Sequence, residues 1–170
     1  MNVIDAIRTK RAMRVFTEQP LPEEAVATIL NAGRRAQSSK NTQPWNFVAV
    51  RERATLKALA ECGTYANHLA GAALAVVIVS VDPAQRWSIM FDCGQSAAYM
   101  QLAAWEMGIG SCLGTIYEAD KARALLGVPT DQHVNVAISF GYPAPDQQRP
   151  AVVNRGGRRP LEAVVHWEKW

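Results

Sequence analysis

Basic side chains gather near both ends of this 170-residue chain. Lys10, Arg11 and Arg14 lie close together near the start and Arg158 lies near the end, whereas the middle is close to neutral and the net charge is only +3. An arginine guanidinium binds a phosphate group through two parallel, charge-assisted hydrogen bonds. The clusters therefore predict a phosphate site if the chain ends meet in space. A solvated helix face is the alternative interpretation, because most runs of charge are exposed.

Small and polar side chains fill residues 38–45, directly before an apolar run. Ser38, Ser39, Asn41 and Gln43 offer hydrogen-bond donors and acceptors that suit the polar edge of a flat, pyrimidine-like ring. An ordinary turn in front of a strand explains the same composition. Taken alone, these residues leave both interpretations open.

A glycine-rich segment, GIGSCLGT, covers residues 108–115. Glycine allows backbone N–H groups to approach a ligand closely, but Gly108 could also simply end the preceding helix. Cys112 is interpreted as a packed thiol, because no histidine or basic residue is its near neighbour in the sequence. The segment does not open a helix, so it is no dinucleotide-binding GxGxxG motif.

The composition bounds the class of protein. It is 49% hydrophobic and 19% charged, which is typical of a globular chain, and the length fits one domain over residues 1–170. The three cysteines lack CxxC spacing and the three histidines are scattered, so neither a metal site nor a disulfide framework is expected. The longest apolar run is too short to span a bilayer, and we expect no secretory signal at the start. We expect a cytoplasmic protein that binds neither membranes nor nucleic acid.

The elements that would position these residues alternate between helix and strand. Apolar spacing predicts helices over residues 2–11, 17–36 with its first turn near Pro22, 52–62, 83–107 and 118–127. Strands are predicted over residues 45–51, 73–81, 108–115 and 133–143. The run 73–81 is continuously apolar and rich in β-branched residues, which indicates a central strand buried on both faces.

Two segments carry more apolar surface than one small domain would bury. Residues 83–107 are almost uncharged on every side, which predicts a helix buried in part against a second copy of the chain. The tail contains Trp167 and Trp170, so we expect it to pack on another surface rather than to be disordered.

Taken in order, these segments resemble the nitroreductase family of FMN-dependent oxidoreductases. KRAMRVF, residues 10–16, is similar to the family's opening RRSxRxF. ILNAGRRAQSSKNTQPWNFVAV, residues 29–50, is similar to ILxAGRxAPSSxNxQPWxFVVV. GIGSCLG after the long helix and RRPLEAVVH near the end are similar to GLGxCWxG and to an arginine followed by KPLEEVVH. The resemblance covers nearly the whole chain.

The resemblance implies an α+β fold of three layers, with a mostly antiparallel sheet between helices. It implies a homodimer with exchanged C-terminal arms and two flavins at the interface. The residues implied to bind FMN are Lys10, Arg11, Ala12, Arg14, Asn67 and Arg158, together with Ser38, Ser39, Asn41 and Gln43 from the partner's loop, behind which Trp45 packs. The backbone N–H groups of Gly114 and Thr115 would lie near flavin N5, and no side chain or metal would be catalytic.

The implied activity is electron transfer from NADH or NADPH through FMN to a flat acceptor, such as a nitroaromatic or a quinone, in ping-pong order. Alternatives are an enzyme of the same fold that dehalogenates, dehydrogenates or consumes flavin, and a flavin-binding protein without turnover. Ala12 replaces the usual serine, which removes one hydroxyl donor to the phosphate. The glycine of SCLGT lies one position early, which leaves open which amide faces N5.

Overall fold

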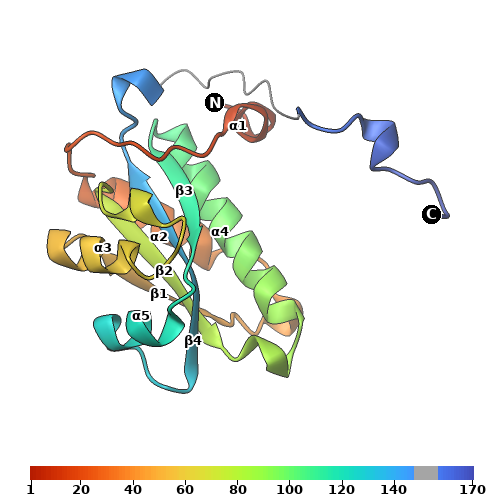
Figure 1. The fold of residues 1–170 in the computed structure, drawn as a ribbon. Helices are drawn as coiled ribbons and strands as arrows, with labels where there is room; N and C mark the ends of the chain where they lie inside the picture. The colour runs from red at the N-terminus through yellow and green to blue at the C-terminus, as the bar shows by residue number, and fades with distance from the viewer. Residues whose placement is uncertain (148–156) are drawn as a thin grey trace.

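The computed structural model describes residues 1–147 and 157–170. Its centre is a four-stranded antiparallel sheet in the order β1-β2-β4-β3 (Figure 1). The strands are β1 (Trp45–Val50), β2 (Leu74–Val81), β3 (Gly110–Thr115) and β4 (Gln132–Gly141). Strands β2 and β4 are therefore interior, and β1 and β3 form opposite edges of the sheet.

Within the described ranges, five α-helices surround the sheet: α1 (Val3–Thr9), α2 (Glu23–Arg34), α3 (Arg53–Ala60), α4 (Ser88–Glu106) and α5 (Ala119–Leu126). Helices α2 and α4 cover one face, and α3 and α5 cover the other (Figure 1). Each face has its own apolar core, with Ile29 and Met100 in the first and Leu56 and Leu59 in the second. The predicted element order and the three-layer α+β fold are confirmed.

Strand β2 is the central strand that its sequence predicts. Every residue of β2 except Val81 is buried, because helices cover both faces of the sheet. Successive side chains of a strand point to opposite faces. Accordingly, Val76 and Ile78 enter the first core, whereas Val77 and Val79 enter the second.

Local sequence determines where α2 begins and α4 ends. Helix α2 starts after Pro22, and Glu23 and Glu24 in its first turn interact favourably with the helix dipole. Gly108 follows α4 with a φ of 72°, a left-handed conformation that glycine adopts without strain. The turn leads directly into β3, so the glycine-rich segment is a helix stop followed by an edge strand.

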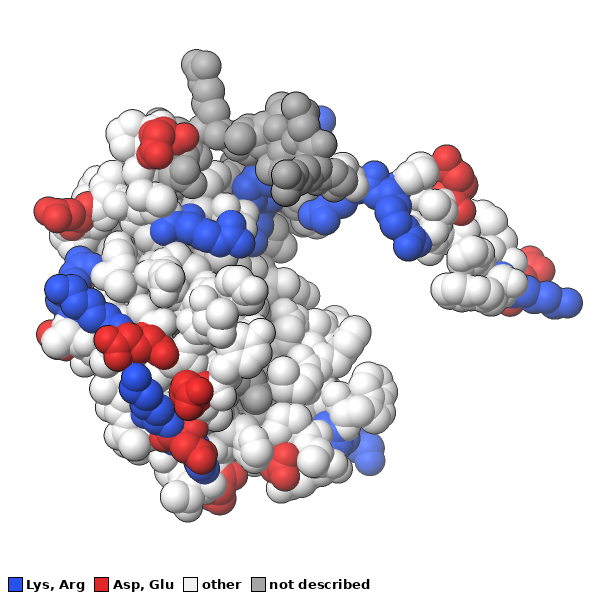
Figure 2. All heavy atoms as spheres, in the orientation of Figure 1, with Lys and Arg blue, Asp and Glu red and all other residues white. Residues whose placement is uncertain are grey.

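Helices α1 and α4 expose apolar side chains. Val3, Ile4 and Ile7 of α1 are all exposed, and Ala6 is its buried residue. Helix α4 packs against α2 and the sheet but exposes Phe91 on its outer side. Few charged side chains interrupt the surface over α4, whereas many gather over α3 and α5 (Figure 2). Within a single chain, α4 is therefore buried on the side that faces α2 and the sheet and exposed on the other side.

Residues 157–170 form an arm that stands clear of the three layers (Figure 1). Trp167 and Trp170 are exposed, and the arm's hydrogen bonds within the described ranges are internal, as between the Val164 N–H and the Leu161 carbonyl at 3.1 Å. Residues 148–156 of the tail lie outside the described residues. The predicted packing of the tail is therefore not seen among the described residues of this single chain.

Candidate functional site

The segment that follows α1 runs along the edge of β3. The Met13 N–H donates to the Ser111 carbonyl at 2.9 Å, and Ala12 forms a parallel bridge with Ser111. Met13 lies over Gly110, where a Cβ atom would come within 2.8 Å of the Met13 Cβ. These contacts fix residues 10–14, which include the predicted phosphate-binding cations, beside β3.

Lys10 and Arg14 both act on Cys112 of this strand. Burial raises the pKa of the Cys112 thiol, and the positive charges of Arg14 and Lys10 oppose that rise. Burial lowers the pKa of Lys10. Cys112 is only 3% exposed, which confirms that it is a packed thiol. The edge of β3 thus carries two basic side chains next to a neutral sulfur.

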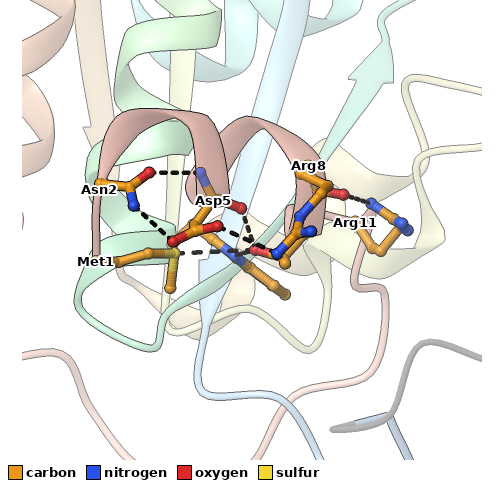
Figure 3. A network of polar contacts seen from close by, with 7 residues as sticks. Met1, Asn2, Asp5, Arg8 and Arg11 are labelled. Atoms are coloured by element: carbon orange, nitrogen blue, oxygen red, sulfur yellow. Dashed lines mark hydrogen bonds and ion pairs between the residues drawn. The ribbon is translucent and has the colours of Figure 1, made fainter.

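Arg11, the third predicted cation, binds backbone carbonyls at the end of α1 (Figure 3). Its Nη1 donates to the Arg8 carbonyl at 2.7 Å and to the Lys10 carbonyl at 2.9 Å, at the end of α1. Arg8 in turn pairs with Asp5, whose N–H donates to the Asn2 side chain. A cation at a helix C-terminus stabilises the carbonyls that lack helical partners. The Arg11 guanidinium therefore serves α1 rather than the edge of β3.

A hollow of about 590 Å³ opens beside Arg14. Its other lining residues are Thr64, Tyr65, Asn67 and His68, from the segment between α3 and β2. Tyr65 and Asn67 are exposed to solvent, whereas His68 is buried. The hollow brings together Arg14 and Asn67, two of the residues assigned to one site from the sequence.

Two glycines allow the segment 63–68 to pack directly on β3. A Cβ atom at Gly114 would lie 3.2 Å from Nε2 of His68, and one at Gly63 would lie 2.2 Å from the Thr115 carbonyl oxygen. The second distance is shorter than real Cβ contacts, so only glycine fits there without a backbone shift. The packing brings this segment against Gly114 and Thr115, as the sequence assignment requires.

Strand β3 presents its backbone alternately to β4 and to the open edge. Ser111 faces the edge, since its carbonyl accepts from Met13. Leu113 and Thr115 follow on the same side, because alternate residues of an antiparallel strand face the same way and the register is regular. The amide of Thr115 is therefore directed at the open edge, and that of Gly114 is directed at β4.

His68 lines the hollow beside Arg14 and was not among the residues predicted from the sequence. Its Nδ1 lies 2.7 Å from Oγ of Ser139, and this hydroxyl donates to the Cys112 carbonyl at 3.2 Å. A hydroxyl has one proton, so Nδ1 carries the ring proton and Nε2 is an acceptor. Among the described residues, Nε2 has no partner. Burial and then the charge of Arg14 lower the pKa of His68, so the ring is neutral at pH 7. The sequence offered one indication of its position, because His68 directly follows Asn67, which the resemblance assigned to the FMN site.

Residues 38–43 form a tight loop at the opposite edge of the sheet, before β1. The Gln43 N–H donates to Oγ of Ser38 at 2.9 Å. The Ser39 N–H donates to Oδ2 of Asp92, on α4, at 3.1 Å. Trp45 is buried in the first core directly after the loop, as predicted.

Three residues of this loop, none of them glycine, adopt left-handed conformations. Their φ angles are 52° at Lys40, 54° at Asn41 and 47° at Gln43. Each such residue costs about 1–3 kcal/mol and persists only where its surroundings hold it. Strain of this kind concentrates at ligand sites. The loop is therefore held in a conformation that its surroundings must stabilise.

The loop and the basic segment lie far apart within one chain. Asp92 holds the loop near the start of α4, whereas Trp105 near its end donates to Oγ1 of Thr9 at 2.9 Å, next to the basic segment. Trp105 follows Asp92 by thirteen residues in the same helix, a rise of about 20 Å. Arg158 is exposed on the arm. Within one chain, the β3 edge and the 38–43 loop therefore do not meet.

The described residues, 1–147 and 157–170, offer neither a metal cluster nor a membrane-crossing helix. No group of three or more His, Cys, Asp or Glu residues there could hold a metal ion. None of the helices in these ranges is long and apolar enough to cross a membrane.

Comparison with known proteins adds to this geometry. The model of the nitroreductase family matches residues 7–63 and 59–142. A protein of Archaeoglobus fulgidus, provisionally named NADH dehydrogenase/NAD(P)H nitroreductase, is 32% identical over 96% of both chains. An FMN-dependent nitroreductase structure from Clostridium difficile R20291 is 27% identical, with a TM-score of 0.85 over 99% of this chain and 100% of that one. The NADPH:FMN oxidoreductase of Vibrio harveyi, complexed with NAD+, is 26% identical, with a TM-score of 0.87 over 98% and 77%.

Proposed function

The chain belongs to the nitroreductase family, and from this premise we propose that it is an FMN-dependent oxidoreductase. It would pass electrons from NADH or NADPH to a flat organic acceptor, such as a nitroaromatic or a quinone. The NADPH:FMN oxidoreductase and the FMN-dependent nitroreductase that it resembles support this assignment. Its three cysteines are free and buried, which fits the expected cytoplasmic location.

The proposal rests on the polar and basic groups that lie together at the edge of β3. Lys10 and Arg14 offer cations that suit the phosphate of FMN. Asn67, on the hollow beside Arg14, offers an amide whose donors and acceptor match a pyrimidine edge. The N–H of Thr115 is directed at the open edge, so we assign it, rather than the N–H of Gly114, to flavin N5. The donor set thus suits both ends of the cofactor.

A second copy of the chain would complete the site. Val3, Ile7 and Tyr99 line an apolar cavity of about 590 Å³ between α1 and α4. Exposed apolar side chains that lie together often mark an interface with protein. Pairing two copies there would bring the 38–43 loop of each to the β3 edge of the other. The exposed arm would be exchanged in the same dimer, which would bring Arg158 to the phosphate.

When bound, FMN supplies the hydride and electron-transfer chemistry. The part of the chain is to bind the phosphate, to orient the ring and to stabilise, through the Thr115 amide, negative charge that develops on it. No protein nucleophile is required, which agrees with buried, neutral Cys112 and His68. We expect ping-pong order, because the nicotinamide and the acceptor would occupy the same exposed face of the flavin one after the other.

The start of α4 offers a surface for a flat acceptor. Trp87 and Phe91 are 81% and 63% exposed, and their rings pair edge to face at 6.3 Å. They lie beside Arg86, which donates to Thr42 of the 38–43 loop at 2.7 Å. An aromatic acceptor held near that loop would therefore find an aromatic surface next to it.

The experiment that tests the proposal is anaerobic reduction of the purified protein. We expect a yellow protein whose flavin absorbance is bleached by NADPH or NADH and returns when a quinone or nitroaromatic is added. Absence of flavin from the purified protein, together with no binding of added FMN, would contradict the assignment of the cofactor. Bound flavin that neither nucleotide bleaches would contradict the reductase activity.

A flavin-binding protein without turnover is the second candidate. Ala12 offers no hydroxyl to the phosphate, and the Arg11 guanidinium is held by α1, so fewer groups face a phosphate than the family motif provides. Both features favour flavin that exchanges readily. Exchange of bound FMN for free FMN within seconds, without oxidation of NADH or NADPH, would support this candidate.

A further inference from the structure

Asp92 is a buried carboxylate in a helix that is otherwise almost uncharged. It is 3% exposed, and its Oδ2 accepts the Ser39 N–H at 3.1 Å and lies 4.0 Å from Nη2 of Arg86. A charge is costly to bury unless hydrogen bonds or an opposite charge compensate it. Its partners lie on the 38–43 loop and directly before α4, so the loop supplies part of that compensation.

Arg86 links Asp92 to the far side of the same loop. Its Nη2 donates to Oγ1 of Thr42 at 2.7 Å, and Thr42 Oγ1 donates to the Ser39 carbonyl at 3.0 Å. The carboxylate and the guanidinium therefore hold the loop at Ser39 and at Thr42. The left-handed residues Lys40 and Asn41 lie between these two points.

We propose that Asp92 is a positioning residue for the flavin site of the partner copy, an inference that rests on the function proposed above. A strained loop relaxes when its anchors are removed. Asp92 fixes Ser39 from within the core, and Arg86 transmits the same constraint to Thr42. The loop would therefore contact the partner's flavin in a single conformation. Because the loop is already ordered in the folded protein, it would lose little conformational entropy when FMN binds.

A merely structural role for Asp92 gives a different expectation. If the carboxylate only stabilised the fold, its loss would lower the melting temperature, and the folded protein would bind FMN with unchanged affinity. If Asp92 positions the loop, the folded dimer would bind FMN more weakly. The spectrum of the flavin that remains bound would also change, because the loop would lie against the ring.

The first test compares Asp92→Asn with Asp120→Asn. Asn keeps the size of the side chain but removes the charge, and Asp120 is an exposed residue paired with Arg123 on α5, away from the loop. We expect the FMN dissociation constant of the folded D92N dimer to rise about 10- to 100-fold, its visible circular dichroism to change, and D120N to match the wild type. A D92N dimer with wild-type affinity and spectrum would overturn the proposal.

A milder variant covers the case in which D92N does not fold. Thr42→Val removes the hydroxyl that accepts from Arg86, on an exposed residue, and leaves Asp92 in place. We expect a severalfold rise in the FMN dissociation constant with little change in melting temperature. Unchanged FMN affinity in T42V would count against the linkage from Asp92 through Arg86 to the loop.

A mixed dimer tests whether Asp92 acts across the interface. One tagged chain carries D92N and the other carries Arg14→Ala. If the loop serves the partner's site, one site of the mixed dimer carries both substitutions and the other carries neither. We expect one FMN bound with wild-type affinity per mixed dimer. No site of wild-type affinity would mean that Asp92 acts on the flavin of its own chain. Wild-type protein that binds no FMN would instead refute the proposed function.

Discussion

The Nδ1 atom of His68 lies 2.7 Å from Oγ of Ser139, and this contact determines the state of a buried imidazole beside the candidate flavin site. The Ser139 hydroxyl donates its hydrogen bond to the Cys112 carbonyl, so His68 must donate through Nδ1. Its Nε2 faces Gly114 and has no partner among the described residues. A proton added to Nε2 would place a buried charge near Arg14, which is why the pKa of His68 is lowered.

The first prediction is loss of stability in acid. The pKa of His68 is lower in the folded protein than its ordinary value of 6.5. The unfolded chain therefore takes up this proton first, and the free energy of unfolding falls as the pH drops below about 6.5. The contribution of one proton is at most about 1.4 kcal/mol per pH unit. In His68→Gln, urea denaturation should show a shallower decline between pH 7 and pH 5 than in the wild type.

His166→Gln provides the control for this measurement. His166 lies on the exposed arm, so its replacement should leave the decline as in the wild type. Equal declines in H68Q and the wild type would show that His68 is not the group responsible.

The second prediction concerns the contact between His68 and Gly114. A Cβ atom at Gly114 would lie 3.2 Å from Nε2 and 3.4 Å from Cε1 of the ring, so Gly114→Ala must displace the imidazole or the strand. We expect a loss of about 1–3 kcal/mol, as for other overpacked sites. Gly71→Ala is the matched control, because nothing lies within 4 Å of its Cβ position. Thermal denaturation of both variants compares the two, and equal stability would contradict the packing described here.

The third prediction separates the two neighbouring arginines. Arg14 lines the hollow at the β3 edge, whereas the Arg11 guanidinium is bound to carbonyls at the end of α1. We expect Arg14→Ala to raise the FMN dissociation constant at least about tenfold, since a charge-assisted contact is worth roughly 1.5–3 kcal/mol. Arg11→Ala should raise it less. Arg158→Ala should also lower the flavin content of the purified protein.

Fluorescence titration with FMN measures all three variants. If R11A loses as much FMN affinity as R14A, or more, the Arg11 side chain must leave α1 and turn to the phosphate when FMN binds. Full FMN occupancy in R14A and R158A would show that the phosphate lies elsewhere.

Periodicity was sufficient to predict the framework but not the contacts across it. The run 73–81 could be assigned to a buried central strand because its composition is explained only by cover on both faces. Val3, Ile4 and Ile7 were correctly placed on one helix, yet a sequence does not say whether an apolar face meets its own core or a second chain. Their exposure answers that question for the single chain.

The site was predictable only in part, for a similar reason. The motifs predicted ligand-binding residues at the β3 edge and in the 38–43 loop, and the resemblance assigned the loop to the partner's flavin. Their spacing, however, gave no distance between the two regions within one chain. Asp92 joins the loop through a hydrogen bond to a residue 53 positions away. His68 matters through packing on Gly114. Neither role leaves a local pattern in the sequence, because each depends on long-range contacts.

The fourth prediction tests the apolar surface of α1. Ile7 is 58% exposed and lines the cavity between α1 and α4. A carboxylate there would lose its hydration if the surface were buried between two copies. We expect Ile7→Asp to be monomeric by light scattering and to have lost most of its FMN. Leu125→Asp, on α5 across the sheet, should remain dimeric, and a dimeric I7D with normal flavin would place the interface elsewhere.

The fifth prediction concerns the acceptor. The exposed ring of Trp87 pairs edge to face with Phe91 beside the 38–43 loop, so its loss should weaken binding of an aromatic acceptor. A stacked aromatic pair contributes about 0.5–1.5 kcal/mol beyond the area that it buries. We expect Trp87→Ala to raise the KM for a nitroaromatic about 3- to 10-fold, whereas the FMN affinity and the rate of flavin reduction by NADPH stay as in the wild type. Trp87→Phe keeps an aromatic ring at this position, so its KM for the nitroaromatic should stay close to that of the wild type. Steady-state kinetics and stopped-flow reduction together decide the matter: equal effects on both half-reactions would mean that Trp87 supports the flavin or the fold rather than the acceptor.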